Sequence, residues 1–475
     1  MEIPILNGVY VDANPRFRTL YPTNMVPVPM QSGISNAYLR PSEGIVGETF
    51  GTGVDRGGIN WNDVCYRVSG SKLIIQPDSG PVTILGDVGG STFDQHVTFN
   101  YSFDRLGIAS NGNLFYWDGT TLTQVTDPDL GTVVDMVWVD GYFMTTDGEF
   151  LVVTELNDPF AVNPLKYGSS EIDPDPVVAL LKLRNEVYAL NRYTIEVFDN
   201  VGGDLFPFQR IEGAQITKGT VGVHACCVFN ESLAFVGSGR NESPSIYLAG
   251  SAQSVKISTQ EIDTLLLNYT EAELSVTLVE TRTDKAHEYL YIHLPDRTIV
   301  YDAATSRAMQ APVWFILTSQ FLNVGTYSQY LGRSFVWCYD RWLVANPQTP
   351  ALGSFSDATS EHWGIGNWWE FSTAIIYNGG RGAIFHELEL VGLTGRPSGL
   401  LPTIPWTVET SWSYDGIEWT PALNASTGLA GNYQQRICWR RLGKMRNWRL
   451  QRFRGFSYAN VPFVRLEAQI EQLAY

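Results

Sequence analysis

Histidine, cysteine and paired carboxylates are the side chains that most often bind metal or carry catalysis, and this sequence disperses them. Its six histidines are His96, His224, His287, His293, His362 and His386. His287 and His293 could flank one strand, but no acidic or thiol partner recurs nearby. The five cysteines show no C-x-x-C spacing, and adjacent Cys226 and Cys227 are poorly placed to bridge each other. The pattern predicts reduced, buried thiols, with no metal site and no cofactor.

Two proline-flanked acidic motifs, DPD from Asp127 and DPDP from Asp173, come nearest to a catalytic acid pair. Such a pair needs two carboxyl groups fixed roughly 5–10 Å apart with divergent pKa values. Proline instead favours extended turns, in which carboxylates are solvated. The phosphate-loop, zinc-protease and serine-hydrolase motifs are absent from the sequence. We therefore expect a protein that is not an enzyme.

The stretch SYDGIEW, from Ser413 to Trp419, resembles the Asp-box of sialidase-type propellers. It is one residue shorter than that motif and occurs only once. In that family the Asp-box is a structural turn, remote from catalysis. We expect Asp415 to cap a β-turn while Trp412 and Trp419 pack.

Positive charge is concentrated near the C-terminus of a chain whose formal net charge is -17. Between Arg436 and Arg454 there are eight basic residues and no acidic ones, interleaved with aromatic side chains. We call residues 436–454 the basic strip. Charge that is segregated in this way indicates a surface that meets a negative partner.

The elements that carry these residues are predicted to be strands. Aromatic residues make up 13% of the chain, beside 44 Gly and 24 Pro, which favours strands joined by tight turns. Alternating hairpins recur from about Gly51, for example from Tyr66 and Glu288, and most start 44 to 56 residues apart. One shorter step, of 29 residues from Asn113 to Tyr142, is interpreted as two hairpins of one blade. Because a propeller blade takes about 40–50 residues, we expect an all-β fold with a β-propeller of about five or six blades.

Two regions break the hairpin rhythm. Residues 1–50 are rich in proline and are predicted to form an extended arm that clamps on another surface. The propeller is expected to span residues 51–346, and residues 347–475 to form a second, sandwich-like β-domain. The arm residues expected to anchor on a neighbouring subunit are Phe17, Tyr21 and Met25.

One segment has a helical pattern, TQEIDTLLLNYTEAEL from Thr259, in which the threonine could serve as N-cap. We expect it to cross between two blades. No stretch approaches the roughly 18 consecutive apolar residues of a membrane span, and the opening residues lack a secretory signal pattern. The sequence predicts a chain made in the cytosol, without membrane insertion.

The end of the basic strip is predicted to be a strand that follows a turn around Gly443 to Asn447. Trp439, Leu450, Phe453 and Phe456 are expected in the core, with a basic face outside. The candidate assembly contacts on that face are Arg440, Arg441, Lys444, Arg446, Arg449, Arg452 and Arg454. Their partner is either DNA, bound without sequence specificity, or an acidic protein surface. The protein contact is favoured, because the rest of the chain is acidic.

Several stretches, taken in order, resemble one known family. They are LYPTNMVPVP from Leu20, AYLRPSEGI from Ala37, RGGINWNDVCYRVSGSKL from Arg56, TKGTVG from Thr217, SPSIYLAGSAQ from Ser243, YIHLPDRTIVYDAATS from Tyr291 and YQQRICWRRLGKMR from Tyr433. The set resembles the packaged-DNA stabilisation protein family, the tail accessory factor, tail hub or nozzle of short-tailed phages. The resemblance covers nearly the whole chain.

The resemblance implies a structural protein of the virion tail that forms a homo-hexamer below the portal and its adaptor. Such a hub extends the DNA conduit, helps to retain the packaged genome, and docks the tail needle or plug and the tailspike or tail fibre. An alternative is a carbohydrate-binding or carbohydrate-cleaving propeller, because Trp and Tyr on loops can stack on sugar rings. The lack of repeated Asp-boxes and of a catalytic acid set argues against that alternative.

Overall fold

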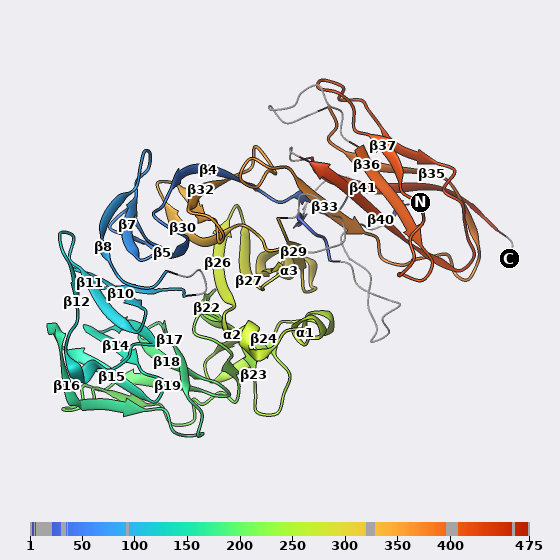
Figure 1. Cartoon of the computed structure of the whole chain (residues 1–475). Coiled ribbons are helices and arrows are strands. Elements are labelled where there is room, and N and C mark those ends of the chain that lie inside the picture. The colour runs from blue at the N-terminus through green and yellow to red at the C-terminus, as the bar shows by residue number, and fades with distance from the viewer. Residues whose placement is uncertain are drawn as a thin grey trace.

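The computed structural model describes the chain except for residues 1, 4, 6–20, 30–34, 36, 92–94, 157, 320–327, 396–406, 458–460 and 474–475. Figure 1 shows a ring of sheets beside a separate pair of layered sheets. The described residues form nine sheets, seven in the ring and two in the layered body. The predicted all-β fold, with a propeller and a sandwich, is confirmed, but the propeller has seven blades rather than five or six.

The first three blades follow one another along the chain. Blade one contains β5 (Asp55–Trp61), β6 (Val64–Ser69), β7 (Lys72–Gln76) and β8 (Thr83–Asp87). Blade two contains β9 (Thr98–Tyr101), β10 (Leu106–Ser110), β11 (Asn113–Trp117) and β12 (Leu122–Gln124). After the short 3-10 helix η1 (Pro128–Leu130), blade three contains β13 (Asp135–Val139), β14 (Tyr142–Thr146), β15 (Phe150–Glu155) and β16 (Asp158–Ser169).

The next three blades continue this order. Blade four contains β17 (Val177–Leu183), β18 (Glu186–Asn191), β19 (Ile195–Asn200) and β20 (Phe208–Arg210). Blade five contains β21 (Gly219–Thr220), β22 (Cys226–Phe229), β23 (Ser232–Ser238), β24 (Ser245–Gly250) and β25 (Gln253–Lys256). Blade six contains β26 (Leu278–Asp284), β27 (His287–His293), β28 (Thr298–Asp302) and β29 (Trp314–Leu317).

The seventh blade closes the ring with a strand from the N-terminal region. It contains β30 (Arg333–Cys338), β31 (Arg341–Ala345), β32 (Ala351–Ser356) and β4 (Gly44–Phe50). Strand β4 pairs antiparallel with β32, and β30 contacts β5 of the first blade. A small cluster of buried residues fills the junction between these two blades, Cys65, Val336, Cys338 and Leu343. Opening the ring therefore requires breaking both a sheet pairing and an apolar contact.

The blade number differs from the prediction because the most conspicuous hairpins do not occupy equivalent places. The hairpin from Asn113 is the outer pair β11 and β12, whereas the one from Tyr142 is the middle pair β14 and β15. The step of 29 residues is short because it runs from the outer hairpin of blade two to the middle hairpin of blade three. Tight turns with two left-handed residues join the first two strands of several blades, for example at Asn62–Asp63 and Lys285–Ala286, as the twist of a hairpin favours.

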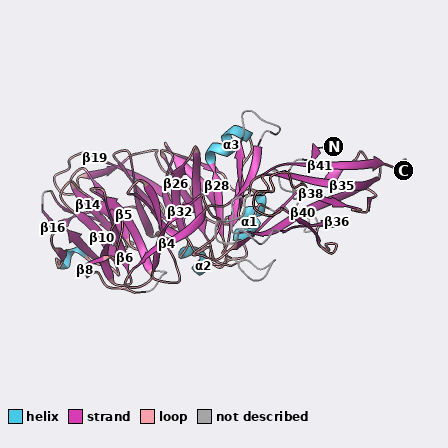
Figure 2. Ribbon diagram, turned by 90° about the horizontal axis from the view of Figure 1, so that it is seen from above, coloured by secondary structure: helices cyan, strands magenta, loops and turns pink. Residues whose placement is uncertain are grey.

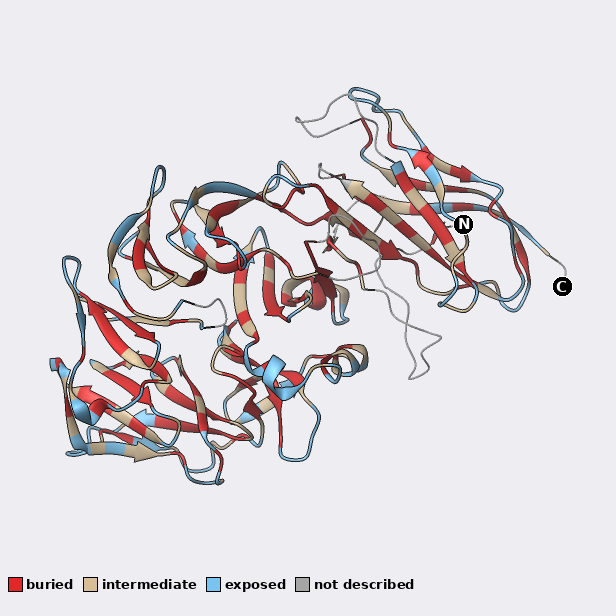
Figure 3. Cartoon of the chain, in the orientation of Figure 1, coloured by how far each residue is buried: buried red, intermediate tan, exposed pale blue. Residues whose placement is uncertain are grey.

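The sandwich packs two sheets against one core cluster of buried residues, and buried residues recur along the strands of both sheets in Figure 3. One sheet contains β1 (Glu2–Ile3), β2 (Met25–Pro29), β3 (Ala37–Pro41), β41 (Phe463–Gln472), β35 (Ala383–Gly392), β38 (Ile437–Arg440) and β39 (Lys444–Met445). The other contains β33 (Asn367–Ser372), β34 (Ile376–Tyr377), β40 (Trp448–Ser457), β36 (Thr407–Ser413) and β37 (Leu423–Ser426).

The observed domain limits differ from the expected ones in two places. Strand β32 extends the propeller to Ser356, past the expected boundary at residue 346. Strands β1, β2 and β3, expected in a free arm, belong to the sandwich. The physical reason is long-range pairing, because β1 and β3 bind β41 and β4 binds β32. Figure 2 shows the two bodies side by side in an elongated molecule.

Helices are short and lie outside the sheets. The segment predicted to be helical forms α1 (Gln260–Leu266) and α2 (Glu271–Ser275), which connect blades five and six as expected. Thr259 is at the N-cap of α1 but makes no side-chain capping bond. The third helix, α3 (Ala303–Met309), follows β28. None of the helices in the described part of the chain is long and apolar enough to cross a membrane.

Candidate assembly surfaces

Two of the three predicted arm anchors pack against their own chain. The Tyr21 hydroxyl donates to Glu261 Oε2 at 3.2 Å and lies 2.6 Å from Thr259 Oγ1, beside α1 of the propeller. Met25 is fully buried in the core of the sandwich. Phe17 lies outside the described residues. Tyr21 and Met25 therefore pack within their own subunit, whereas a contact with a neighbouring subunit was expected.

The segment around these anchors ties the propeller to the sandwich, and we call residues 21–29 the strap. The backbone of Thr23 exchanges two hydrogen bonds with Glu370 on β33, at 2.8 and 3.0 Å. On the other side, Ile316 N of β29 donates to Pro22 O at 2.8 Å, and Asn24 N donates to Ile316 O at 2.7 Å. The strap thus forms backbone hydrogen bonds with the propeller and with the sandwich.

The side chain of Asn24 repeats this bridge. Its Nδ2 donates to Trp368 O in the sandwich at 2.6 Å, and its Oδ1 accepts from Thr318 N in the propeller at 3.0 Å. Asn24 is 2% exposed and has a φ of 54°, in the left-handed region. Asparagine is one of the few residues that tolerate that conformation.

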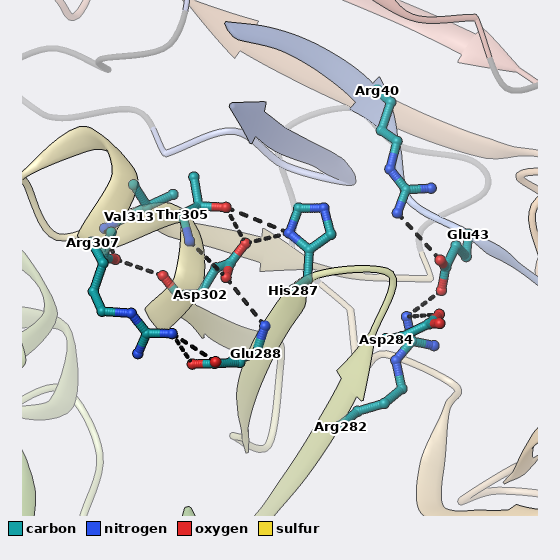
Figure 4. Close-up of polar contacts among 11 residues, drawn as sticks. Arg40, Glu43, Arg282, Asp284, His287, Glu288, Asp302, Thr305, Arg307 and Val313 are labelled. Atoms are coloured by element: carbon teal, nitrogen blue, oxygen red, sulfur yellow. Dashed lines mark hydrogen bonds and ion pairs between the residues drawn. The ribbon is translucent and has the colours of Figure 1, made fainter. Parts of the chain in front are cut away.

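A buried ion cluster lies where the chain passes from sandwich strand β3 to propeller strand β4, shown in Figure 4. Glu43 forms ion pairs with Arg40, at 3.2 Å, and with Arg282 of β26. Arg40 also contacts Asp357, at 3.1 Å. Burial alone would raise the pKa of Glu43, but the charges of Arg282, Arg40 and Lys285 outweigh it and hold that pKa at about 2.

The histidines on β27 have acidic neighbours that sequence spacing did not reveal. His287 Nδ1 lies 2.6 Å from Asp302 Oδ2, to which Thr305 Oγ1 also donates at 2.5 Å (Figure 4). His293 Nε2 lies 3.2 Å from Glu280 Oε1. In a catalytic triad the hydroxyl would face the imidazole nitrogen opposite the carboxylate. Here the hydroxyl and the carboxylate share one side of His287, and Asp302 also caps α3, so the trio stabilises the helix start.

The two proline-flanked carboxylates are engaged in local structure and lie in different links of the propeller, Asp127 between blades two and three and Asp173 between blades three and four. Asp127 caps η1 by accepting from Asp129 N, and it also accepts from Val162 N, each at 3.0 Å. Asp173 lies 4.0 Å from Arg240 in an exposed ion pair. The structure does not bring these carboxylates together as an acid pair.

The SYDGIEW turn is confirmed as a capped loop in the sandwich. Asp415 Oδ1 accepts from Ile417 N at 2.8 Å, and the local backbone bonds lower the pKa of this carboxyl. Trp412 packs against the sandwich core. Trp419 lies under the guanidinium of Arg452, whose Cζ is 4.0 Å from the ring centroid.

The basic strip is divided by the structure into three parts, and the first is already neutralised. Arg436 contacts Glu387 at 3.0 Å and Glu389 at 2.5 Å on the neighbouring strand β35. Arg440 contacts Glu387 at 2.9 Å. Glu387, Glu389 and Cys438 are grouped closely enough to be compared with a metal site. Because Arg436 and Arg440 form ion pairs with these carboxylates, pairing between neighbouring strands explains why the acidic residues lie close together.

The second part of the strip faces inward, which corrects the expected basic face. Arg449 is fully buried, donates to Leu442 O at 3.0 Å and Gln451 Oε1 at 2.5 Å, and stacks on Phe385 at 3.6 Å. Burial lowers the pKa of Arg449 to about 10. Because side chains alternate along β40, Phe453 and Arg449 share the inner face. An inward arginine of this kind holds the turn before β40 and is not available to a partner.

The neighbouring residues of β40 are on the other face but are also engaged. Arg452 donates to Ser411 Oγ at 3.2 Å beneath Trp419, and burial lowers its pKa to about 10. Arg454 forms an ion pair with Glu370. Of the four predicted core residues, Trp439 and Phe453 join the sandwich core cluster, Leu450 is buried apart from it, and Phe456 is half-buried.

The third part of the strip, Arg441, Lys444 and Arg446, is free for a partner. We define the basic patch as these three residues together with the exposed Arg440, which is already paired with Glu387. All four are exposed, and Arg440 retains 74% of its side-chain surface despite its ion pair. No side-chain hydrogen bond or ion pair joins Arg441, Lys444 or Arg446 to any residue that the structure describes. They surround the turn between β38 and β40, at one edge of the sandwich.

Sequence reasoning missed the strap and the ion cluster, since both depend on contacts between distant segments. A local signal did exist for Arg449, because a strand that buries Phe453 must place Arg449 on the same face. The five cysteines are all free thiols, as expected from their spacing.

The match to known families follows the two bodies of the structure. Residues 1–360 match the family described as Bacteriophage P22 Gp10, beta-propeller, and residues 368–471 match Bacteriophage P22 Gp10, beta-sandwich. The chain belongs to the P22 Gp10 family. A relative, the tail hub protein gp10 of Salmonella phage P22, is 26% identical over 471 residues, which cover 94% of each chain. The resemblance seen in the ordered sequence stretches is therefore confirmed.

Two solved structures are only distantly similar to this chain. The Pan2 WD40 domain of Neurospora crassa has a TM-score of 0.41 and 9% identity, covering 64% of this chain and 89% of that one. PorZ of Porphyromonas gingivalis has a TM-score of 0.40 and 12% identity, covering 79% of this chain and 46% of that one. Similarity at this level carries no information about function.

Proposed function

We propose that this chain is a structural tail hub of a short-tailed phage. The observation that carries the proposal is the similarity of both bodies, over 94% of the chain, to a protein named as a tail hub. The hub works as a homo-hexameric ring below the portal adaptor, in the virion tail, after synthesis in the host cytoplasm. Its role is mechanical, and it is not an enzyme.

The architecture suits a wall that must resist the pressure of packaged DNA. The propeller is closed by β4, and the strap and the Glu43 ion cluster bind it to the sandwich. Each subunit therefore acts as a block with few independently moving parts. Six such blocks around an axis extend the conduit and help to retain the genome, while DNA passes without sequence-specific contact.

The basic patch is the surface that we assign to assembly. Three of its cations have no partner in the described residues, in a chain with a net charge of -17. An acidic surface on a neighbouring hub subunit or on the adaptor complements them through bidentate arginine–carboxylate pairs. The tailspike or tail fibre and the tail needle or plug dock on other faces of the ring.

Charge reversal tests this assignment. The variant Arg441→Glu/Arg446→Glu should weaken binding to the purified adaptor or to other hub subunits, and the loss should grow smaller as salt rises, because salt screens exposed charges. The control is Arg184→Glu, an exposed arginine in the turn between β17 and β18 of the propeller, which should assemble normally. Normal assembly of the double variant, together with DNA leakage from particles that carry it, would instead place the patch on the DNA channel.

A further inference from the structure

A small cavity lies beside the Glu43 ion cluster, where the sandwich meets the propeller. Its walls come from sandwich strands β2 and β3 and from blades six and seven. Its volume is about 20 Å³, which is room for one or two particles of the size of a water molecule. Polyatomic anions such as phosphate and sulfate are too large for this space. A water molecule or a monatomic ion fits.

Arg282 lines this cavity and has hydrogen-bond donors that its own chain does not use. Its Nη2 donates to Glu43 and lies 3.7 Å from Asp284 Oδ2. Its Nε and Nη1 are buried and make no hydrogen bond with any residue that the structure describes. The Arg282 side chain is 2% exposed, and a buried donor without an acceptor is costly. An acceptor in the cavity would remove that cost.

The hydroxyl group of Tyr289 is a second free donor at the same cavity. Tyr289 on β27 is the direct cross-strand partner of Arg282 on β26, and the Arg282 Cζ lies 5.5 Å from the Tyr289 ring centroid. The Tyr289 hydroxyl is buried and makes no hydrogen bond with a described residue. Burial raises the pKa of Tyr289 well above its ordinary value, so the hydroxyl keeps its proton. Two adjacent strands therefore bring unused donors to one cavity.

The charge of the lining distinguishes an anion from a water molecule. Among the described residues, the charged side chains that line the cavity are two cations, Arg40 and Arg282, and one anion, Glu43. Further charges lie around the cluster but outside the lining, on Asp284, Lys285 and Asp357, whose side chains are 20%, 55% and 43% exposed. Solvent screens these outer charges more than the buried ones. The excess of positive charge in the lining favours a negatively charged ligand.

We propose that this cavity binds one chloride ion between Arg282 and Tyr289. The ion accepts hydrogen bonds from the unused N–H groups of the guanidinium and from the tyrosine hydroxyl. It adds to the single negative charge that Glu43 supplies inside the lining. Because the sandwich and the propeller both contribute to the walls, bound chloride stabilises the junction between them.

Urea unfolding of the full chain at pH 7 tests the site, in mixtures of sodium chloride and sodium gluconate at constant ionic strength. Gluconate is too large for the cavity. We expect the free energy of unfolding to rise with the logarithm of chloride concentration above the dissociation constant, as for one ion bound to the folded chain. In Tyr289→Phe the fitted dissociation constant should be about tenfold higher, because one hydrogen bond to the ion is lost.

The matched control is Tyr116→Phe in blade two. Tyr116 is 2% exposed, and its hydroxyl is also buried without a hydrogen bond to a described residue, but it does not line the cavity. This variant should respond to chloride as the wild type does. A general effect of salt on stability would appear equally in both variants, so the difference between them isolates the site.

Crystals of the wild-type chain soaked in sodium bromide locate the ion directly. Bromide replaces chloride and scatters anomalously, so we expect an anomalous peak within hydrogen-bonding distance of Arg282 and Tyr289. A water molecule in the cavity, with no bromide peak, would overturn the proposal. Equal stability in chloride and gluconate would do the same. Equal chloride affinity in Tyr289→Phe and Tyr116→Phe would place any bound chloride elsewhere and would also overturn it.

Discussion

Arg282 of the propeller forms a buried ion pair with Glu43, the residue at which the chain crosses from the sandwich to the propeller. Their side chains are 2% and 6% exposed. Arg40 lies on the sandwich side of the same carboxylate, so Glu43 is held by cations from both bodies. The pair links the strand that closes the ring to the orientation of the sandwich.

Replacement of Glu43 by glutamine should destabilise the chain by about 3–5 kcal/mol, since it leaves Arg282 buried without its counter-charge. Urea unfolding, followed by tryptophan fluorescence, measures the change in free energy of unfolding. The matched control is Asp357→Asn, which removes the more exposed partner of Arg40 and should cost no more than about 1 kcal/mol. Equal losses in the two variants would show that the buried pair has no special role.

The same carboxyl should give the chain a characteristic acid sensitivity. Glutamate titrates near pH 4.5 when unfolded, and the pKa of Glu43 in the folded chain is about 2. A lowered folded pKa stabilises the fold above pH 4.5, and this stabilisation is lost as the pH falls towards 2. The contribution is on the order of 3 kcal/mol. Unfolding free energies of wild type and Glu43→Gln should converge between pH 4.5 and 2, and parallel curves would contradict the assignment.

Asn24 offers a separate test of the strap. In Asn24→Gly the hydrogen bonds to Trp368 and Thr318 are lost but the left-handed backbone is retained, so we expect a loss of about 2 kcal/mol. In Asn24→Ala the backbone also becomes strained, which should add about 1 kcal/mol. Thermal and urea unfolding of both variants measure these changes in the free energy of unfolding. If neither variant were less stable than the wild type, the strap would not join the two bodies energetically.

The hairpins of the propeller could be predicted because each is formed by adjacent residues. Alternation and tight turns mark the pair from Tyr66 and the pair from Glu288 without any tertiary information. The number of blades could not be derived in the same way. A count from the sequence requires knowing which pair of strands each recognised hairpin forms within its blade. It also requires knowing that β4 pairs with β32, far along the chain. No local pattern in Gly44–Phe50 indicates that partner.

The basic strip was predicted less well than the hairpins, for a related reason. Its composition indicated charge, but the pairing of β40 with β33 and β36 decided which arginines face inward. Arg449 entered the core and Arg454 paired with Glu370, while Arg441 and Arg446 stayed exposed in the turn. The candidate surface is therefore the turn before β40 and not the strand itself.

The mass of the purified chain, measured by native mass spectrometry alone and after addition of its portal adaptor, tests the tail-hub proposal most directly. We expect complexes that contain six copies of the 53.0 kDa chain once the adaptor ring is present, with fewer such complexes for Arg441→Glu/Arg446→Glu. A chain that stays monomeric with the adaptor, or that closes rings of another copy number, would contradict the account.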